Sequence, residues 1–118
     1  MKAELLFHQP PHNYNCAQSV VKAWQERFNI PEQVIEEFRA NGGGRAEDGI
    51  CGALYGAFYL LKNDPEKRKE IEKQFNERIG SVYCRQIKKE NKHSCQKCVH
   101  IADTLLESML QSADDTKI

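Results

Sequence analysis

Hydrophobic residues recur along most of the chain at intervals of three and four positions, which is the spacing of one face of an α-helix. A first stripe begins after Asn13 and runs to Phe28, and a shorter one after Pro31 ends at Phe38. Asn13 is placed to cap the first helix, and Pro31 suits a first helical turn. We therefore expect two helices here, with the glycines at 42–44 ending the second and turning the chain.

The next expected helix, over residues 49–62, is apolar on every side and should be central. Within it Gly52 and Gly56 lie four residues apart, as do Ala53 and Ala57. Such a surface of small residues lets a neighbouring helix approach closely. We therefore expect tight packing of this helix against another.

Three further helices are expected in the second half of the chain. One begins at Pro65 and ends at Gly80, a shorter one spans 81–89, and the last runs from Ser94 to about Ser112. No segment alternates with the period of two that marks a β-strand, and no internal repeat is present. The pattern therefore predicts an all-α bundle of about five to six helices.

The composition favours one domain in an aqueous compartment. A chain of 118 residues with 40% hydrophobic residues suits a single core, and we expect an arm over 1–12, a helical core over 13–112 and a frayed tail over 113–118. Seventeen basic and seventeen acidic residues cancel, which argues against nucleic acid or an anionic membrane as partner. Without a transmembrane-length apolar run or a signal-peptide core, the expected location is cytoplasmic.

The five cysteines fall near the expected helix starts. A capping residue precedes three of them by three positions, in the pairs Asn13 with Cys16, Asp48 with Cys51, and Ser81 with Cys84. Ser94 stands directly before Cys95 and four positions before Cys98. A helix N-terminus lowers the pKa of a thiol by less than about 1, so a strongly reactive thiolate also needs a cation or a metal.

Positive charge surrounds the last three cysteines. Residues 84–98 contain five basic residues and one acidic residue, namely Arg85, Lys88, Lys89, Lys92, Lys97 and Glu90. This field should act most on Cys84, Cys95 and Cys98.

The histidines carry less information. His12 is near enough to Cys16 to serve as an auxiliary ligand or proton partner, whereas His8, His93 and His100 are expected in the arm, in a loop and on the surface.

Three chemistries could explain five cysteines. An odd count in a reducing compartment argues against a structural disulfide framework. Helices that start around one end of a bundle could bring four thiolates together for an iron–sulfur cluster or another metal, although zinc is less favoured because only one Cys-x-x-Cys is present. Alternatively, Cys95 and Cys98 could form a redox disulfide within one helical turn, outside any thioredoxin-like context.

The third alternative is structural. Cysteine also behaves as a small buried hydrophobe, which would make this a helical scaffold or a partner-binding module. No serine, histidine and carboxylate set supports hydrolysis, so any enzymatic activity would be that of an oxidoreductase or electron carrier.

Taken together, the segments YNCAQSV, GGG, ICGALYGA and GSVYCRQI, with a late cysteine before the final helix, resemble the C_GCAxxG_C_C family of redox-active proteins. The resemblance covers residues 13–110, and its sharpest element is CGAxxG, present as CGALYG over residues 51–56. It implies a helical fold and redox or metal chemistry at four cysteines, which by motif are Cys16, Cys51, Cys84 and Cys95.

In this resemblance Cys98 is an addition, or a substitute for Cys95. The leading hypothesis is an iron–sulfur cluster, [2Fe-2S] first, that these four cysteines hold for electron transfer or sensing. A cofactor-free thiol–disulfide protein is the alternative. A redox partner protein and a homodimer are compatible with either.

Overall fold

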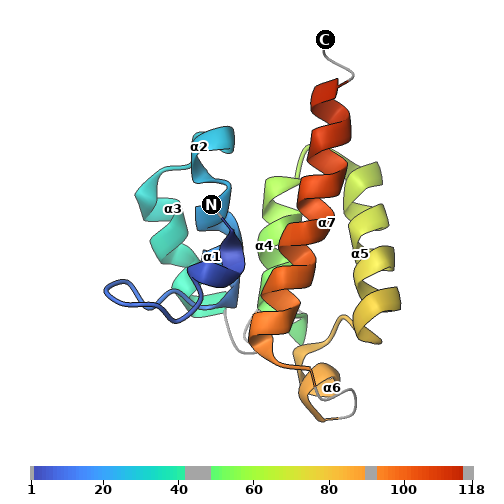
Figure 1. Cartoon of the computed structure of the whole chain (residues 1–118), viewed down its shortest axis with the longest axis horizontal. Helices are drawn as coiled ribbons and strands as arrows, with labels where there is room; N and C mark the ends of the chain where they lie inside the picture. Colours follow the sequence, from blue (N-terminus) through green and yellow to red (C-terminus); the bar gives the residue numbers. More distant parts are fainter. Residues whose placement is uncertain (1, 42–48, 90–92, 116–118) are drawn as a thin grey trace.

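The computed structural model describes residues 2–41, 49–89 and 93–115, which form helices joined by turns and irregular segments (Figure 1). Its helices are α1 (Cys16–Ala23), α2 (Gln25–Phe28), α3 (Glu32–Glu37), α4 (Gly52–Leu60), α5 (Pro65–Ile79), α6 (Cys84–Lys89) and α7 (Cys95–Asp115), with 3₁₀ turns η1 (Ala3–Leu5) and η2 (Phe38–Asn41). Within those ranges no β-strand forms, and only two isolated bridges occur. The all-α prediction is confirmed. No described helix has both the length and the apolar character needed to cross a bilayer.

Helix α4 is central, as its all-round apolar sequence predicts. It lies between α1 on one side and α5 and α7 on the other (Figure 1). Its buried residues are Gly52, Ala53, Leu54, Gly56, Ala57 and Leu60. The helix is shorter than expected because Gly49 adopts a positive φ of 74° and Cys51 is extended, so helical geometry begins only at Gly52.

The small residues of α4 admit α1 at close range. A Cβ atom added to Gly56 would lie 2.9 Å from the carbonyl oxygen of Ala17 and 3.4 Å from both Val20 and Val21. Backbone and side chains of α1 therefore press directly on the position that lacks a side chain. The tight packing predicted from the glycine and alanine spacing is present.

The helix starts differ from the predictions in detail. Asn15 caps α1 in place of Asn13, because its side chain accepts from the Gln18 N–H at 2.8 Å while Gln18 Oε1 accepts from the Asn15 N–H at 3.0 Å. The single helix expected up to Phe28 breaks at Trp24, whose ψ of 13° is not helical. The following α2 ends at Asn29, in the left-handed region.

Two other helix ends agree with the sequence signals, and one helix start does not. Ser94 caps α7 through Oγ, which accepts from the Lys97 N–H at 3.1 Å. Gly80, with φ of 97°, ends α5. Ser81 is not the cap of α6, since its Oγ accepts from the Tyr83 N–H at 3.1 Å and the helix begins only at Cys84.

The N-terminal segment, expected as an arm, packs against the bundle. Ala3 is fully buried, and its N–H donates to the carboxylate of Asp103 at 3.0 Å. The Trp24 indole donates to the other oxygen of Asp103 at 2.8 Å. This buried carboxylate joins the segment to the end of α1 and to α7, because two donors compensate its loss of water.

Four predicted features lie outside the described residues: the turn at Gly42–Gly44, the Asp48 cap, the charges of Glu90 and Lys92, and the tail beyond Asp115. Helix α7 itself continues three residues past the predicted end at Ser112.

Replacement of Gly56 by Ala tests the α1 and α4 contact. Overpacking against a backbone carbonyl costs about 1–3 kcal/mol, and the gain in helix propensity returns at most about 1 kcal/mol. We expect the free energy of unfolding to fall by about 1 kcal/mol in urea titrations. The matched control Lys73→Ala, on the exposed face of α5, should stay within about 0.5 kcal/mol. A more stable G56A protein would contradict the close approach.

Candidate functional site

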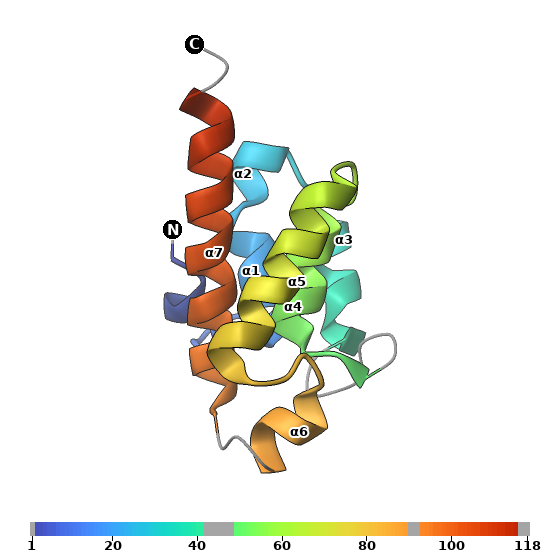
Figure 2. The same cartoon turned by 90° about the vertical axis from the view of Figure 1, so that its right-hand side faces the viewer.

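All five cysteines line one small cavity at the end of the bundle where α7 begins. Cys16 starts α1, Cys51 directly precedes α4, Cys84 starts α6, and Cys95 and Cys98 lie in the first turn of α7. The other lining residues are Gly52, Ile87, Lys88 and His93. Figures 1 and 2 show α6 lying across this end of the molecule.

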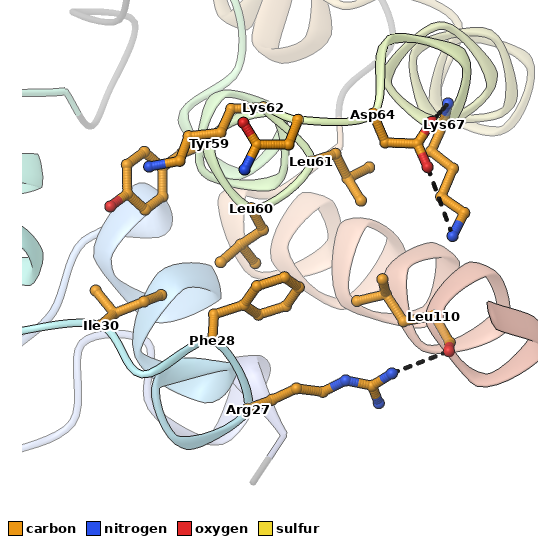
Figure 3. Close-up of a pocket in the computed structure, with 11 residues that line it drawn as sticks. Arg27, Phe28, Ile30, Tyr59, Leu60, Leu61, Lys62, Asp64, Lys67 and Leu110 are labelled. Atoms are coloured by element: carbon orange, nitrogen blue, oxygen red, sulfur yellow. Dashed lines mark hydrogen bonds and ion pairs between the residues drawn. The ribbon is translucent and has the colours of Figure 1, made fainter. Parts of the chain in front are cut away.

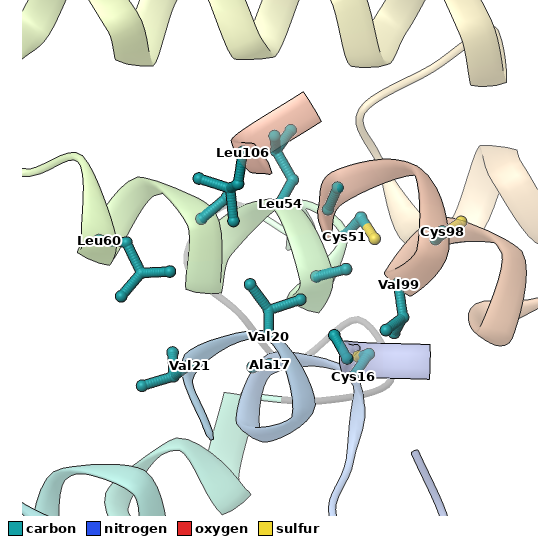
Figure 4. Close-up of a cluster of buried hydrophobic side chains, with 14 of the residues drawn as sticks. Cys16, Ala17, Val20, Val21, Cys51, Leu54, Leu60, Cys98, Val99 and Leu106 are labelled. Carbon is teal, nitrogen blue, oxygen red and sulfur yellow. The ribbon is translucent and has the colours of Figure 1, made fainter. Parts of the chain in front are cut away.

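Three of these cysteines also belong to the buried hydrophobic cluster. Cys16, Cys51 and Cys98 lie at one end of the buried cluster, whereas Val21 and Leu60 lie at the other (Figure 4). The cysteines therefore extend the hydrophobic core and line the cavity where three helices begin.

Backbone pairing fixes two of the cysteines beside each other. The Cys51 N–H donates to the carbonyl of Val82 at 2.7 Å, and Ile50 pairs with Tyr83 in an isolated antiparallel bridge. This short contact holds the start of α4 against the start of α6. Cys51 and Cys84 are therefore neighbours although 33 positions separate them in the sequence.

Burial divides the cysteines into two classes. Cys16 and Cys51 are 4% exposed, Cys84 is 8% exposed and Cys98 is 2% exposed. Cys95 is of intermediate exposure. An external reagent or partner therefore meets Cys95 first.

The Cys51 thiol interacts directly with Cys98. A hydrogen bond with Cys98 and then burial raise the pKa of Cys51 well above its ordinary value. The N–H groups of Leu54 and Ala53, at the start of α4, oppose this with a smaller effect. Cys51 is consequently a protonated thiol at neutral pH.

Lys88 is the cation closest to this chemistry. The charges of Cys95 and then Cys84 raise the pKa of Lys88, which also forms a hydrogen bond with Cys95. Burial raises the pKa of Cys84, and Lys88 lowers it by less. The ammonium group therefore stays charged at the rim of the cavity and favours negative charge on the neighbouring sulfurs.

Among the lysines and arginines of the predicted positive field, Lys88 is the described residue that lines the cavity. Lys88 follows Cys84 by four positions, which places both on one face of α6, and this spacing could have singled it out. His93 lines the cavity where the sequence predicts only a loop residue. The backbone N–H of His93 donates to the Ile87 carbonyl at 3.2 Å, and no sequence motif predicts this contact.

The remaining histidines stand away from the sulfurs. His12 stacks on Tyr14 with ring centroids 5.0 Å apart and does not line the cavity. His100 shares a hydrogen bond of 2.8 Å with Glu4 on the surface, in agreement with the expectation of a surface residue.

The space between the cysteine side chains decides whether they can hold a metal ion or a cluster. The cavity has a volume of about 10 Å³, enough for roughly one water-sized atom. A [2Fe-2S] cluster adds two iron and two sulfide ions between the thiolates. Among the described residues, no group of three or more His, Cys, Asp or Glu side chains is arranged to hold a metal ion. In this arrangement the cysteines do not fit a cluster or a metal ion.

A larger cleft of about 560 Å³ opens at the other end of α4, between α2 and α7 (Figure 3). Its cations already have protein partners. Arg27 donates to the Leu110 carbonyl at 3.0 Å, and Lys67 lies 3.7 Å from Asp64. Arg27 and Lys67 are therefore engaged within the protein in the described structure.

Comparison with known proteins agrees with the motif. The model of a family described as "Putative redox-active protein (C_GCAxxG_C_C)" matches residues 14–109. This confirms the resemblance identified from the sequence. No curated protein and no solved structure gives a significant match.

The two cysteine classes predict an order of alkylation. In the folded, reduced protein at neutral pH, iodoacetamide should label Cys95 first and Cys51 last, with rates at least about tenfold apart, because burial hinders the reagent at Cys51 and its raised pKa lowers the fraction present as thiolate. Peptide mass spectrometry over time gives the rates. Labelling of Cys51 should keep rising above the pH at which the urea-unfolded chain levels off, and equal rates for the two cysteines in the folded state would contradict the arrangement.

Proposed function

This chain belongs to the C_GCAxxG_C_C family of redox-active proteins, and from that membership and the cysteine cavity we propose that it carries electrons in its thiols, as a dithiol that is reversibly oxidised to a disulfide. The observation that carries the proposal is the convergence of all five cysteines, one of them accessible, on a cavity that leaves little space between them.

Cys95 and Cys98 are the proposed redox pair. They occupy the first and fourth positions of α7, a separation that puts helical Cα atoms about 5 Å apart, within the range that a disulfide spans. Cys95 is accessible to another molecule, whereas Cys98 is buried behind it. This asymmetry suits an exchange in which Cys95 attacks first and Cys98 then displaces the mixed disulfide.

The reaction is a two-electron exchange. Oxidation of the pair removes two electrons and two protons from the two thiols and forms one S–S bond, while a disulfide of another molecule takes up the same electrons and protons and becomes two thiols. Reduction reverses each change.

Cys51 is a third thiol that can exchange with the Cys95–Cys98 disulfide, at a lower rate. Because it contacts Cys98, it can attack a Cys95–Cys98 disulfide at Cys98, which forms a Cys51–Cys98 disulfide and releases Cys95 as a thiolate. Attack by a thiol requires its thiolate form, which the raised pKa of Cys51 keeps scarce. We therefore expect the Cys95–Cys98 disulfide to form quickly and the Cys51–Cys98 disulfide to form slowly.

The iron–sulfur hypothesis stays a prediction. Its ligands would be Cys16, Cys51, Cys84 and Cys95, which line the same cavity, but the described donor arrangement does not provide the metal geometry. Loading would require the helix starts to separate.

A thiol titration tests the proposed pair. Mild oxidation with a disulfide reagent should lower the number of free thiols from five to three, and a dithiol reductant should restore it. Cys98→Ala should abolish the internal disulfide and leave a mixed disulfide on Cys95. The matched control Cys84→Ala, which removes another cavity cysteine, should still lose two thiols. An unchanged thiol count across redox buffers would exclude thiol–disulfide chemistry.

Metal and acid-labile sulfide analysis, with an absorption spectrum, separates the two candidates. For protein purified without oxygen we expect iron, sulfide and zinc well below one equivalent per chain. Stoichiometric iron and sulfide, with visible absorbance that Cys51→Ser removes, would replace the thiol proposal with a cluster.

A further inference from the structure

Positive charge is concentrated where Cys95 reaches the surface. The described residues of this region, 84–89 and 93–100, contain no Asp or Glu. They contain four cationic side chains, all exposed, namely Arg85, Lys88, Lys89 and Lys97. Because the whole chain has a net charge of zero, this excess is a local feature and not a general property of the surface.

These cations have no carboxylate partner among the described residues. The ion pairs of the described chain lie elsewhere, in the pairs Lys22 with Glu32, Arg39 with Glu36, Lys67 with Asp64 and His100 with Glu4. Lys88 instead faces the sulfurs of the cavity. Its charge is therefore available to a molecule that approaches Cys95.

We propose that the disulfide exchanged at Cys95 is that of a small molecule bearing carboxylates, and that Lys88 is the residue that selects it. This inference rests on the proposed thiol–disulfide function and names its substrate class. Lys88 fits the role because it is the one cation of the four that both lines the cavity and contacts Cys95.

Exchange at Cys95 proceeds in two steps. The Cys95 thiolate attacks one sulfur of the external disulfide, so that a bond forms between Cys95 and that sulfur, the external S–S bond breaks, and one carboxylate-bearing thiolate leaves. Cys98 then attacks Cys95 Sγ, forms the internal disulfide and releases the second thiolate. Both leaving thiolates take up a proton, and the two protein thiols supply these protons.

A small disulfide suits this geometry better than a protein disulfide. Cys95 is only partly exposed, and the thiols behind it are buried in a cavity of about 10 Å³. A compact molecule can place its S–S bond against such a recessed sulfur while its carboxylate pairs with Lys88. The charge of Lys88 would raise the local concentration of such a molecule at Cys95, and salt would weaken this effect.

Two small disulfides of opposite charge test the proposal. The reduced protein is mixed with dithiodipropionate, which carries carboxylates, or with cystamine, which carries amines, and the rate of internal disulfide formation is measured at low and high salt. The quantity of interest is the ratio of the two rate constants. A change in the intrinsic reactivity of Cys95 alters both rates equally and cancels in this ratio.

We expect Lys88→Gln to lower the dithiodipropionate to cystamine ratio by about tenfold at low salt. Lys88→Arg should preserve the ratio, because it keeps the charge. Lys89→Gln is the matched control, since Lys89 is an exposed neighbour on α6 that does not line the cavity, and it should change the ratio by less than about threefold.

The outcomes separate this inference from the function on which it rests. A ratio in K88Q equal to that of the wild type would overturn selection by Lys88 while exchange continues. Oxidation by an oxidised thioredoxin but by neither small disulfide would overturn the small-molecule substrate and keep the thiol function. If none of the three oxidises the wild-type protein, the proposed function itself fails.

Discussion

The approach of α1 to α4 at Gly56 is the contact on which the rest of the molecule depends. A Cβ atom at position 56 would lie only 2.9 Å from the Ala17 carbonyl oxygen, so the two helices approach each other at close range. Cys16 precedes Ala17, and Cys51 lies at the start of α4. The approach of α1 to α4 therefore places the first two cysteines at one cavity. Helices α6 and α7 contribute the other three.

The other cysteines arrive through different means. The backbone hydrogen bond between Cys51 and Val82 carries α6 to the end of α4, and the packing of α7 along α4 and α1 brings Cys98 into the core. Three independent constraints, a glycine contact, a short backbone bridge and a hydrophobic helix face, thus converge on the same small volume. One result is a graded set of thiols, from the accessible Cys95 beside a lysine to the buried Cys51 whose charge is suppressed.

Much of this fold follows from local sequence signals. Hydrophobic spacing predicts the helices, Gly80 and Ser94 mark their ends, and the glycine and alanine spacing predicts the close packing of the central helix, because each of these effects acts within a few residues. The predicted caps Asn13 and Ser81 were wrong. Several polar residues lie near each of these helix starts, and contacts with other parts of the fold decide which of them caps the helix. Asn15 is selected because its amide also donates to the carbonyls of Phe38 and Arg39. The convergence of the cysteines was expected. The position of His93 at the cavity was not, because His93 follows α6 in a part of the sequence without hydrophobic periodicity.

The buried carboxylate of Asp103 has a further consequence. The indole that it binds belongs to the only tryptophan of the chain, located where α1 ends, while Asp103 itself lies on α7, the helix that begins with Cys95 and Cys98. The molecule thus contains its own optical reporter, since any shift of the cysteine-bearing helix relative to α1 alters the polarity around one identified fluorophore. Asp103 lies only five positions after Cys98 on this helix, so changes at the sulfurs can be followed through Trp24 without adding a label.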